Sequence, residues 1–507
     1  MRRPRTTLAI ATAGMKAAAG TCLAFTPSTA TAAPLGAATT FVVVQGGTGT
    51  DKAVAAVAAA GGEVVQEWPQ IGVVIARAAD DTFDDQARTR PGIVAAGPTR
   101  ALQPIAPAAG IVPDGTVQGF APGTSGGDDT TEPLNAEQWD MRQIKADQAH
   151  ELTDGNRDVV VGVLDSGIEA DHPDLAANVD ASLSVGCTNQ GRPDASPTAW
   201  QPTTSDHGTH VAGTIAAARN GVGIIGVAPN VRLASIKVVD DHGYIYPEYA
   251  ICGFVTAADK GIDVTNNSYF IDPYYLWCKA DLDQRAVVTA VERALKYSEK
   301  KDVVSVSSAG NSAWDLSKPI TDTGSPDNVD DPEPRFTDHR CYDMPTEVDN
   351  TVSVSSVGPT AVKSYYSNYG RNVIDVTAPG GDSRVPSATP SRNGRILSTV
   401  TNGGWGWKQG TSMAGPHVAG VLALIRGTDT GLKAKQAINV LEREADQLAC
   451  PTFYDANRDG VNDATCEGKK TGSGYYGAGH STGLNRPLDG SEPATRRLRL
   501  RGDERAH

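Results

Sequence analysis

Short apolar segments alternate with helical patterns through residues 135–486 of the chain. Helical stretches between strands are typical of β-α-β units, in which helices cover a sheet of parallel strands. The region is therefore predicted to be an α/β domain with a parallel sheet. The strand candidates share a strand-like length and many β-branched residues: 159–164, 233–239, 262–265, 303–307 and 352–355.

Residues 40–105 show a different order of elements. The pattern predicts a strand, an Ala-rich helix, two strands, a second helix and a last strand. This β-α-β-β-α-β order is typical of a small split β-α-β domain, which we assign to residues 34–105. The predicted elements are 41–44, 51–60, 63–67, 71–76, 80–87 and 93–96.

Three other segments lack such periodicity. Residues 1–33 have a basic start, a moderately apolar stretch and small residues in that order, which predicts a signal peptide. Residues 106–134 are rich in Pro, Gly, Ser, Thr and Asp and are predicted to be a flexible linker. The polar, Arg-rich segment 487–507 is predicted to be a disordered tail. No later apolar run is long enough to span a bilayer, so no membrane partner is expected.

Composition narrows the functional classes. The 507 residues carry a formal charge of −14, so the basic surface of a nucleic-acid-binding protein is not expected. Cys22 lies in the predicted signal peptide, and six further cysteines suggest up to three disulfides in an oxidising compartment. Six cysteines allow fifteen pairings. Proximity along the chain favours Cys252–Cys278 and Cys450–Cys466, which leaves Cys187–Cys341.

Three motifs contain residues suited to nucleophilic catalysis. Asp165 follows the strand candidate 159–164, and the carboxyl ends of parallel strands collect ligands and catalytic groups. His210 lies in Asp-His-Gly-Thr-His-Val-Ala-Gly, which opens a helix of small residues, and a histidine is the natural general base near neutral pH. Ser412 precedes an apolar helix, whose free N-terminal N–H groups favour a developing anion.

Each motif also has a plainer interpretation. An Asp after a strand can be a turn residue, and a Ser before a helix is a common N-cap. His207 and His210 are three residues apart, as in some metal pairs, but His-Glu-x-x-His is absent and no third nitrogen ligand stands out. We interpret His207, like His172 and His417, as a capping or packing residue.

The order Asp, His, Ser along the chain is that of subtilisin. The three segments resemble the active-site signatures of the subtilisin-like serine proteases (subtilases). The resemblance covers most of 135–486 and implies a doubly wound α/β/α fold with a mainly parallel central sheet. It gives Ser412 as the nucleophile, His210 as the general base and then acid, and Asp165 as the group that orients the imidazole. Asn311, in Ser-Ser-Ala-Gly-Asn, is similar to the family's oxyanion asparagine.

The resemblance also implies where substrate binds. In the family an extended peptide adds a strand between two edge segments. The usual Leu-Gly of one segment is replaced here by Tyr269 and Phe270. We hypothesise that Phe270 narrows or redirects the primary specificity pocket; packing of both rings away from the pocket is the alternative. The implied substrate-binding residues are Gly243, Tyr244, Ser268, Tyr269, Phe270, Ser308, Ala309 and Gly310.

Residues 34–105 resemble the family's inhibitory propeptide in pattern and position. Such a domain would assist folding and block the cleft until cleavage in, or just before, residues 104–133. The resemblance thus implies a secreted, extracellular zymogen that processes itself. Its partners would be protein or peptide substrates and its own propeptide, and we expect a monomer.

No cofactor is expected for catalysis, but structural calcium is. Asp174 and Asn220 match positions that bind calcium in many relatives, although the glutamine expected near the mature start is displaced, with Gln138 nearest. A second candidate loop has oxygen ligands at alternating positions and the turn glycine of a calcium loop. Its twelfth position is Cys466 instead of an acid, so a disulfide-stapled surface loop is the alternative. The candidate ligands in this loop are Asp455, Asn457, Asp459 and Asp463.

The sequence therefore predicts a secreted serine endopeptidase, with two alternatives. One is a dedicated leader-peptide processing peptidase of narrow specificity. The Tyr269-Phe270 pair favours it slightly, whereas the absence of acidic or basic clusters typical of charge-reading clefts argues against it. The other is a catalytically silent peptide-binding relative, which the complete set of catalytic residues disfavours.

Overall fold

Eight strands form the central sheet of a computed structural model that describes residues 38–100, 132–469 and 472–483. All neighbouring strands pair in parallel except β6 and β7. Each of the five predicted strand segments overlaps one of these strands, and the mainly parallel α/β fold is confirmed. In sheet order the strands are β16 (Val376–Pro379), β15 (Thr351–Val357), β11 (Val304–Ser308), β9 (Val264–Asn267), β5 (Val160–Asp165), β8 (Arg232–Lys237), β6 (Val185–Asn189) and β7 (Arg192–Asp194).

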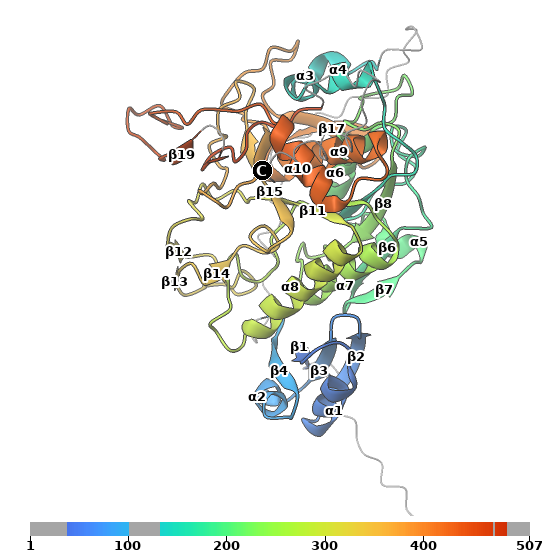
Figure 1. The fold of residues 1–507 in the computed structure, drawn as a ribbon, viewed down its shortest axis with the longest axis vertical. Coiled ribbons are helices and arrows are strands. Elements are labelled where there is room, and N and C mark those ends of the chain that lie inside the picture. Colours follow the sequence, from blue (N-terminus) through green and yellow to red (C-terminus); the bar gives the residue numbers. More distant parts are fainter. Residues whose placement is uncertain (1–37, 101–131, 470–471, 484–507) are drawn as a thin grey trace, which may run out of the picture. The chain divides into compact units, whose positions relative to one another are not determined.

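Helices cover both faces of this sheet because successive strand residues point to opposite sides. On β5, Val161 and Val163 pack in one core with α6 (His207–Ala216), α9 (Thr411–Thr428) and α10 (Ala434–Glu444). Val160 and Leu164 point the other way, into a core with α7 (Pro247–Asp259) and α8 (Arg285–Lys300). Figure 1 shows α7 and α8 on one side of β11, with α9 and α10 on the other.

Short elements complete this large domain. The hairpin of β17 (Ile396–Val400) and β18 (Gly404–Lys408) is antiparallel and packs against α6. No helix in the described ranges is long and apolar enough to cross a membrane. The remaining elements are η2 (Asn135–Glu137), α3 (Trp139–Gln143), α4 (Ala146–His150), α5 (Pro197–Trp200), β10 (Trp277–Cys278), β12 (Ile320–Asp322), β13 (Arg335–Thr337), β14 (Cys341–Tyr342), β19 (Gly468–Lys469) and β20 (Gly472–Ser473).

The disulfide pairing differs from the prediction at two of the three bridges. Only the predicted Cys450–Cys466 pair is found; the other bridges are Cys187–Cys252 and Cys278–Cys341. Strand β6, which carries Cys187, packs against helix α7, which carries Cys252. Strands β10 and β14 place Cys278 directly opposite Cys341. Proximity in the fold, and not along the chain, decides which thiols can reach each other.

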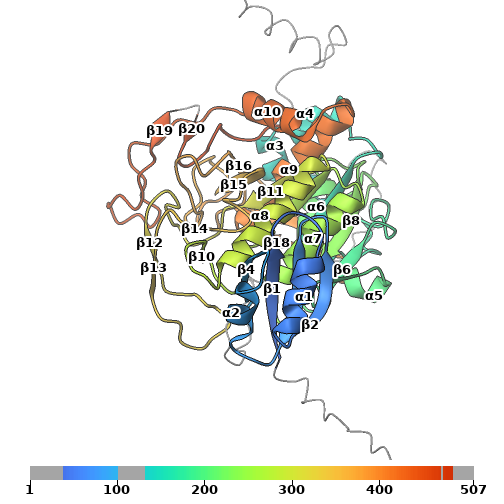
Figure 2. The same ribbon diagram turned by 60° about the horizontal axis from the view of Figure 1, so that its bottom comes forward.

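Residues 38–100 adopt the predicted β-α-β-β-α-β order. Phe41 and Val43 pack on this small domain's own helices, whereas Val42 and Val44, on the opposite sheet face, share a core with α8. Figure 2 shows helix α1 on the near side of the small sheet. Its strands, in the sheet order β2-β3-β1-β4, are β2 (Glu63–Trp68), β3 (Val73–Ala78), β1 (Thr39–Gln45) and β4 (Ile93–Pro98), and its helices are α1 (Asp51–Ala59) and α2 (Phe83–Arg88).

Polar contacts also join this small sheet to α8 and the loop before it. Arg293 of α8 donates to the carbonyl oxygens of Gln45 at 2.8 Å and Ile71 at 3.0 Å. Gly97 of β4 packs on the backbone of Asp283, where an added Cβ would lie 1.9 Å from the carbonyl oxygen. The small domain therefore docks through the sheet face that its own helices leave uncovered. The predicted signal peptide and tail, and the predicted linker up to residue 131, lie outside the described residues.

Candidate active site

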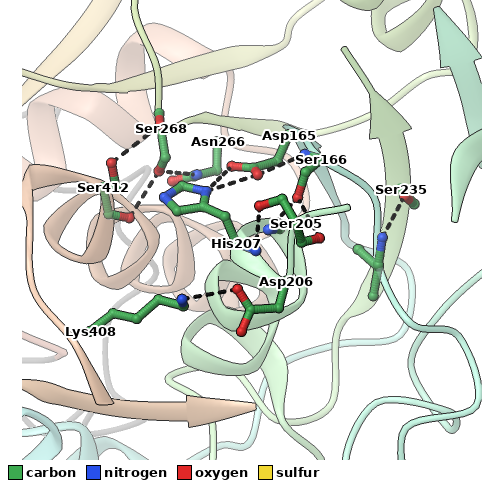
Figure 3. A network of polar contacts seen from close by, with 12 residues as sticks. Asp165, Ser166, Ser205, Asp206, His207, Ser235, Asn266, Ser268, Lys408 and Ser412 are labelled. Atoms are coloured by element: carbon green, nitrogen blue, oxygen red, sulfur yellow. Dashed lines mark hydrogen bonds and ion pairs between the residues drawn. The ribbon is translucent and has the colours of Figure 1, made fainter. Parts of the chain in front are cut away.

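The carboxylate of Asp165, at the end of β5, faces a histidine ring. Nδ1 of His207 lies 2.9 Å from Oδ1 and 3.0 Å from Oδ2 of Asp165. Oδ1 also accepts the backbone N–H of Ser166 at 2.7 Å, and the Asp165 and His207 side chains are buried. Figure 3 shows the His207 ring between the Asp165 carboxylate and Ser412. The carboxylate therefore holds the ring with its far nitrogen toward the serine.

The first turn of α6 brings His207 to this position. Gly208 packs against the end of β5, where an added Cβ would lie 3.1 Å from Asp165 Oδ1 and 2.5 Å from the carbonyl oxygen of Gly167. The Gly208 N–H donates to the hydroxyl of Ser166 at 2.9 Å. A residue with a side chain at 208 would thus push the helix away from the strand end.

The structure contradicts the placement of His210 against Asp165. His210 lies one helical turn further on, where Nε2 is 3.3 Å from the Ile396 carbonyl oxygen and 3.2 Å from that of Gly406. Its Nδ1 is buried and has no hydrogen-bond partner among the described residues. Burial, with further effects from Lys408 and His207, holds the pKa of His210 well below its usual range. His210 therefore ties α6 to the hairpin β17–β18, and His207, assigned to capping or packing by sequence, takes the position against Asp165.

Two further histidines are held by structural contacts. His417 on α9 lies with Nε2 3.0 Å from Asp140 Oδ2 and Nδ1 2.8 Å from the Met413 carbonyl oxygen. His172 Nε2 lies 2.8 Å from the Gly404 carbonyl oxygen. Both fit the packing role predicted for them.

Ser412 lies in the first turn of α9, beside the end of β9. Its hydroxyl donates to the Ser268 carbonyl oxygen at 3.2 Å, and the Ser268 hydroxyl donates to the Ser412 carbonyl oxygen at 3.0 Å. Gly415 permits this approach, because a Cβ there would lie 3.1 Å from Asn266 Oδ1. The N-terminal end of α9, where the helix dipole is positive, thus meets the carboxyl edge of the sheet.

Asn311 follows β11 and is exposed beside the start of α9. Its Oδ1 accepts the backbone N–H of Thr411 at 2.8 Å and the Thr411 hydroxyl at 3.0 Å. An amide carries its acceptor and its donor on different atoms, so these bonds turn Nδ2 of Asn311 away from Thr411. The position of a Cβ added to Gly410 lies 3.5 Å from Asn311 Nδ2 and 3.7 Å from the Ser412 nitrogen, so this side-chain donor lies beside the start of α9.

Comparison with known proteins places this chain in a family. Residues 156–479 match the subtilase family, which is more than half of the chain. The chain belongs to the subtilase family. Subtilisin of Bacillus pumilus is 31% identical over 314 residues, which are 62% of this chain and 93% of that protein.

Two solved structures have a similar fold. The epidermin leader peptide processing serine protease of Staphylococcus aureus matches with a TM-score of 0.64 at 20% identity, over 90% of this chain and 99% of that one. A lanthipeptide protease matches with a TM-score of 0.52 at 25% identity, over 72% of this chain and 98% of that one. The first likeness is one of fold alone, because identity is low.

Two predicted substrate-binding segments of this subtilase lie side by side. The Ile245 N–H donates to the Asp272 carboxyl group, and the Asp272 N–H donates to the Ile245 carbonyl oxygen at 2.9 Å. These bonds join the stretch around Gly243 and Tyr244 to the segment that follows Phe270. The geometry thus brings together the two edge segments that the sequence indicated.

The two aromatic residues in place of Leu-Gly behave differently. Tyr269 is 8% exposed, packs in the core with α7 and α8, and donates from its hydroxyl to Asn267 Oδ1 at 3.1 Å. Phe270 is half-buried and packs on Tyr275, with 4.3 Å between ring centroids. Tyr269 therefore follows the packing alternative, and the hypothesis of a reshaped pocket rests on Phe270.

Asp174 and Asn220 keep their calcium site as a prediction only. Asp174 Oδ2 accepts the N–H of Ile224 at 3.0 Å and the indole N–H of Trp405 at 2.7 Å. Calcium ligands are oxygens that face the ion. Here two N–H groups face the carboxylate. The Trp405 ring packs closely on Gly223, because a Cβ added to this glycine would lie 2.3 Å from ring atoms. The two hydrogen bonds use Oδ2 alone; Oδ1 of Asp174 is buried without a hydrogen-bond partner among the described residues.

A carboxylate occupies the adjacent loop. The buried Glu132 side chain accepts three consecutive backbone N–H groups, of Asn220, Gly221 and Val222, at 2.8–3.0 Å. Residues 132–134, assigned to the linker by sequence, therefore belong to the large domain.

The loop 455–463 keeps its calcium site as a prediction only. Its carboxylates accept N–H groups of their own loop, with Asp455 bonded to Gly460 at 2.8 Å and Asp463 to Ala456 at 2.6 Å. The described part of the chain holds no group of three or more His, Cys, Asp or Glu side chains placed to bind a metal.

We expect Glu132→Gln to lower the free energy of unfolding by about 1–3 kcal/mol, because three backbone N–H groups lose a charged acceptor. Denaturant unfolding measures the change. Glu137→Gln, which alters a more exposed carboxylate bonded to Ser391, is the control. If added calcium restored the stability that Glu132→Gln loses, the conclusion that the Glu132 carboxylate holds this loop would be contradicted.

Proposed function

We propose that this subtilase hydrolyses peptide bonds through Asp165, His207 and Ser412. The observation that carries the proposal is the contact of 2.9 Å between His207 Nδ1 and Asp165 Oδ1, with Ser412 on the other side of the ring. A carboxylate that accepts Nδ1–H fixes the tautomer in which Nε2 is a base. Few other roles would use an imidazole held in this way beside a helix-terminal serine.

The reaction then proceeds through an acyl-enzyme. Ser412 Oγ attacks the carbonyl carbon as its proton moves to His207 Nε2, and Asp165 stabilises the imidazolium that forms. His207 returns the proton to the leaving amine as the C–N bond breaks. Water then attacks the ester, again with His207 as base, and the acid product leaves. Asn311 Nδ2 and the Ser412 N–H are the proposed donors to the oxyanion.

We also propose that residues 38–100 form the inhibitory propeptide of a secreted, self-processing zymogen. Arg100, two residues beyond β4, forms an ion pair with the fully buried carboxylate of Glu248. The Tyr246 ring lies 3.7 Å below the guanidinium carbon. Glu248 is in the first turn of α7, close after the predicted substrate residues Gly243 and Tyr244. This ion pair anchors the end of the small domain close to the proposed cleft.

Processing of leader peptides is a second candidate function. It is supported by the lanthipeptide protease, whose chain this one matches over 98% of its length at 25% identity. Cleavage of casein at many bonds would favour a broad protease, whereas cleavage of few members of a peptide library would favour the narrower role.

His207→Ala should lower kcat by roughly four orders of magnitude or more, because the general base is lost. His210→Gln should lower thermal stability while kcat of the folded enzyme stays within about tenfold, since a structural contact and not the base is altered. Hydrolysis of a fluorogenic peptide and thermal unfolding provide the two readouts. A His210→Gln enzyme that folds like the native one but is inactive, beside an active His207→Ala enzyme, would reverse the assignment.

Ser412→Ala should be secreted at full length, whereas the native chain should lose its first hundred or so residues.

In the native background, Arg100→Ala should shorten the delay between chain cleavage and full activity. Glu248 loses its buried partner in this variant, so association of the cleaved small domain with the large domain weakens roughly a hundredfold. Mass spectrometry and a time course of peptide hydrolysis measure both effects. Arg90→Ala, within the small domain and bonded to Ala59, is the matched control. An unchanged delay in Arg100→Ala would refute the anchoring role.

A further inference from the structure

One segment, residues 343–346, joins two of the proposed substrate-binding stretches. The Ile271 N–H donates to the Met344 carbonyl oxygen at 2.9 Å, next to the stretch 268–270. The Thr346 hydroxyl donates to the carbonyl oxygen of Ser308 at 2.9 Å, on the stretch 308–310. The segment therefore bridges the two stretches, and we call it the floor segment.

Asp343 is the acidic residue of the floor segment. It is 5% exposed, and its Oδ1 is buried without a hydrogen-bond partner among the described residues. Its Oδ2 lies 3.5 Å from the position of a Cβ added to Gly310, one residue before Asn311. The Asp343 carboxylate thus lies beside the stretch 308–310, which leads to the proposed oxyanion donor Asn311.

No cation in the described part of the chain compensates this carboxylate. Within the described ranges, neither Asp343 nor Glu347 forms an ion pair with Lys, Arg or His. A second acid lies beside Asp343, because the Glu347 carboxylate accepts the Asp343 backbone N–H at 2.8 Å. Burial, followed by the charge of Glu347, raises the pKa of Asp343 well above its ordinary value. Ionising Asp343 is therefore unfavourable until a cation arrives beside it.

We propose that Asp343 makes this enzyme selective for an arginine or lysine side chain on the residue whose carbonyl group Ser412 attacks. The inference rests on the function proposed above. That carbonyl lies at Ser412 and Asn311, so the side chain of the same residue extends between stretches 268–270 and 308–310 toward the floor segment. A guanidinium or ammonium group there supplies the missing partner of Asp343, and a neutral side chain leaves the acid buried and unpaired.

The test uses the self-processed native enzyme and peptides that differ only in the residue before the scissile bond. Arginine and citrulline form the central pair, because they are similar in shape and differ in charge; lysine, leucine and glutamate complete the set. We expect kcat/KM for the arginine peptide to exceed that for the citrulline peptide by roughly a hundredfold or more. In Asp343→Asn this ratio should fall to within about tenfold, because the carboxylate partner of the guanidinium is lost.

Asp375→Asn is the matched control, because Asp375 is a partly buried carboxylate that accepts the backbone N–H of Ser353 on β15 at 2.8 Å. It should leave the arginine-to-citrulline ratio unchanged. A native enzyme that cleaves the citrulline or leucine peptide as well as the arginine peptide would overturn the proposal while the proposed function stands. The native ratio needs no variant, so misfolding of Asp343→Asn does not obscure this result.

A second measurement tests whether the floor segment binds a cation, without relying on catalysis. The amidinium probe 4-aminobenzamidine should bind the processed native enzyme, and Asp343→Asn should weaken its Kd by roughly a hundredfold. Equal binding by the two proteins, or no binding by either, would overturn the proposal. If no peptide is cleaved although the probe binds as expected, the proposed function fails and the cation site remains.

Discussion

The hydrogen bond between buried Asp165 and His207 is the contact on which the rest of this structure depends. It requires the end of a strand to meet the first turn of a helix, and the proposed chemistry requires the first turn of a second helix at the same place. Strand β5 supplies the carboxylate, the first turn of α6 supplies the imidazole, and the first turn of α9 supplies Ser412. The parallel sheet makes this meeting achievable, because the carboxyl ends of its strands lie along one edge.

This geometry requires helix starts and strand ends to approach one another closely, and glycines permit that approach. Gly208 lets α6 reach the end of β5, and Gly415 lets α9 reach the end of β9. The same edge also gathers Asn311 after β11 and Ser268 after β9. Two acidic groups near the proposed cleft differ in their partners: Glu248 is paired by Arg100 of the small domain, and Asp343 Oδ1 has no hydrogen-bond partner in the described residues.

The sequence was informative where a pattern maps directly onto an element. The β-α-β-β-α-β order, the five strand segments and the places of Asp165 and Ser412 at a strand end and a helix start all emerge from periodicity. It was ambiguous for the histidine, because residues 207 and 210 share one motif and nearly one helix face. The discriminating fact is distance from the sheet edge: His207 begins α6, whereas His210 lies a turn further in, at the hairpin β17–β18.

Features that depend on distant segments were out of reach of the sequence. Cys187 meets Cys252 because β6 packs on α7, which no spacing along the chain reveals. Glu132 lies at the border of a segment with linker composition, yet it fills a loop expected to bind calcium. Asp343 stands alone in sequence, and only the bonds of Met344 and Thr346 to two separate stretches place it near the proposed cleft.

The most direct test of the central claim is covalent labelling with a fluorophosphonate, followed by mass spectrometry of the digested protein. A serine is phosphonylated rapidly only when a neighbouring base removes its proton and an oxyanion site stabilises the intermediate. The account predicts one label per processed native chain, on Ser412, and labelling slowed by orders of magnitude when Asp165 is replaced by Asn. Absence of a label from folded, processed protein, or a label on another serine, would contradict it.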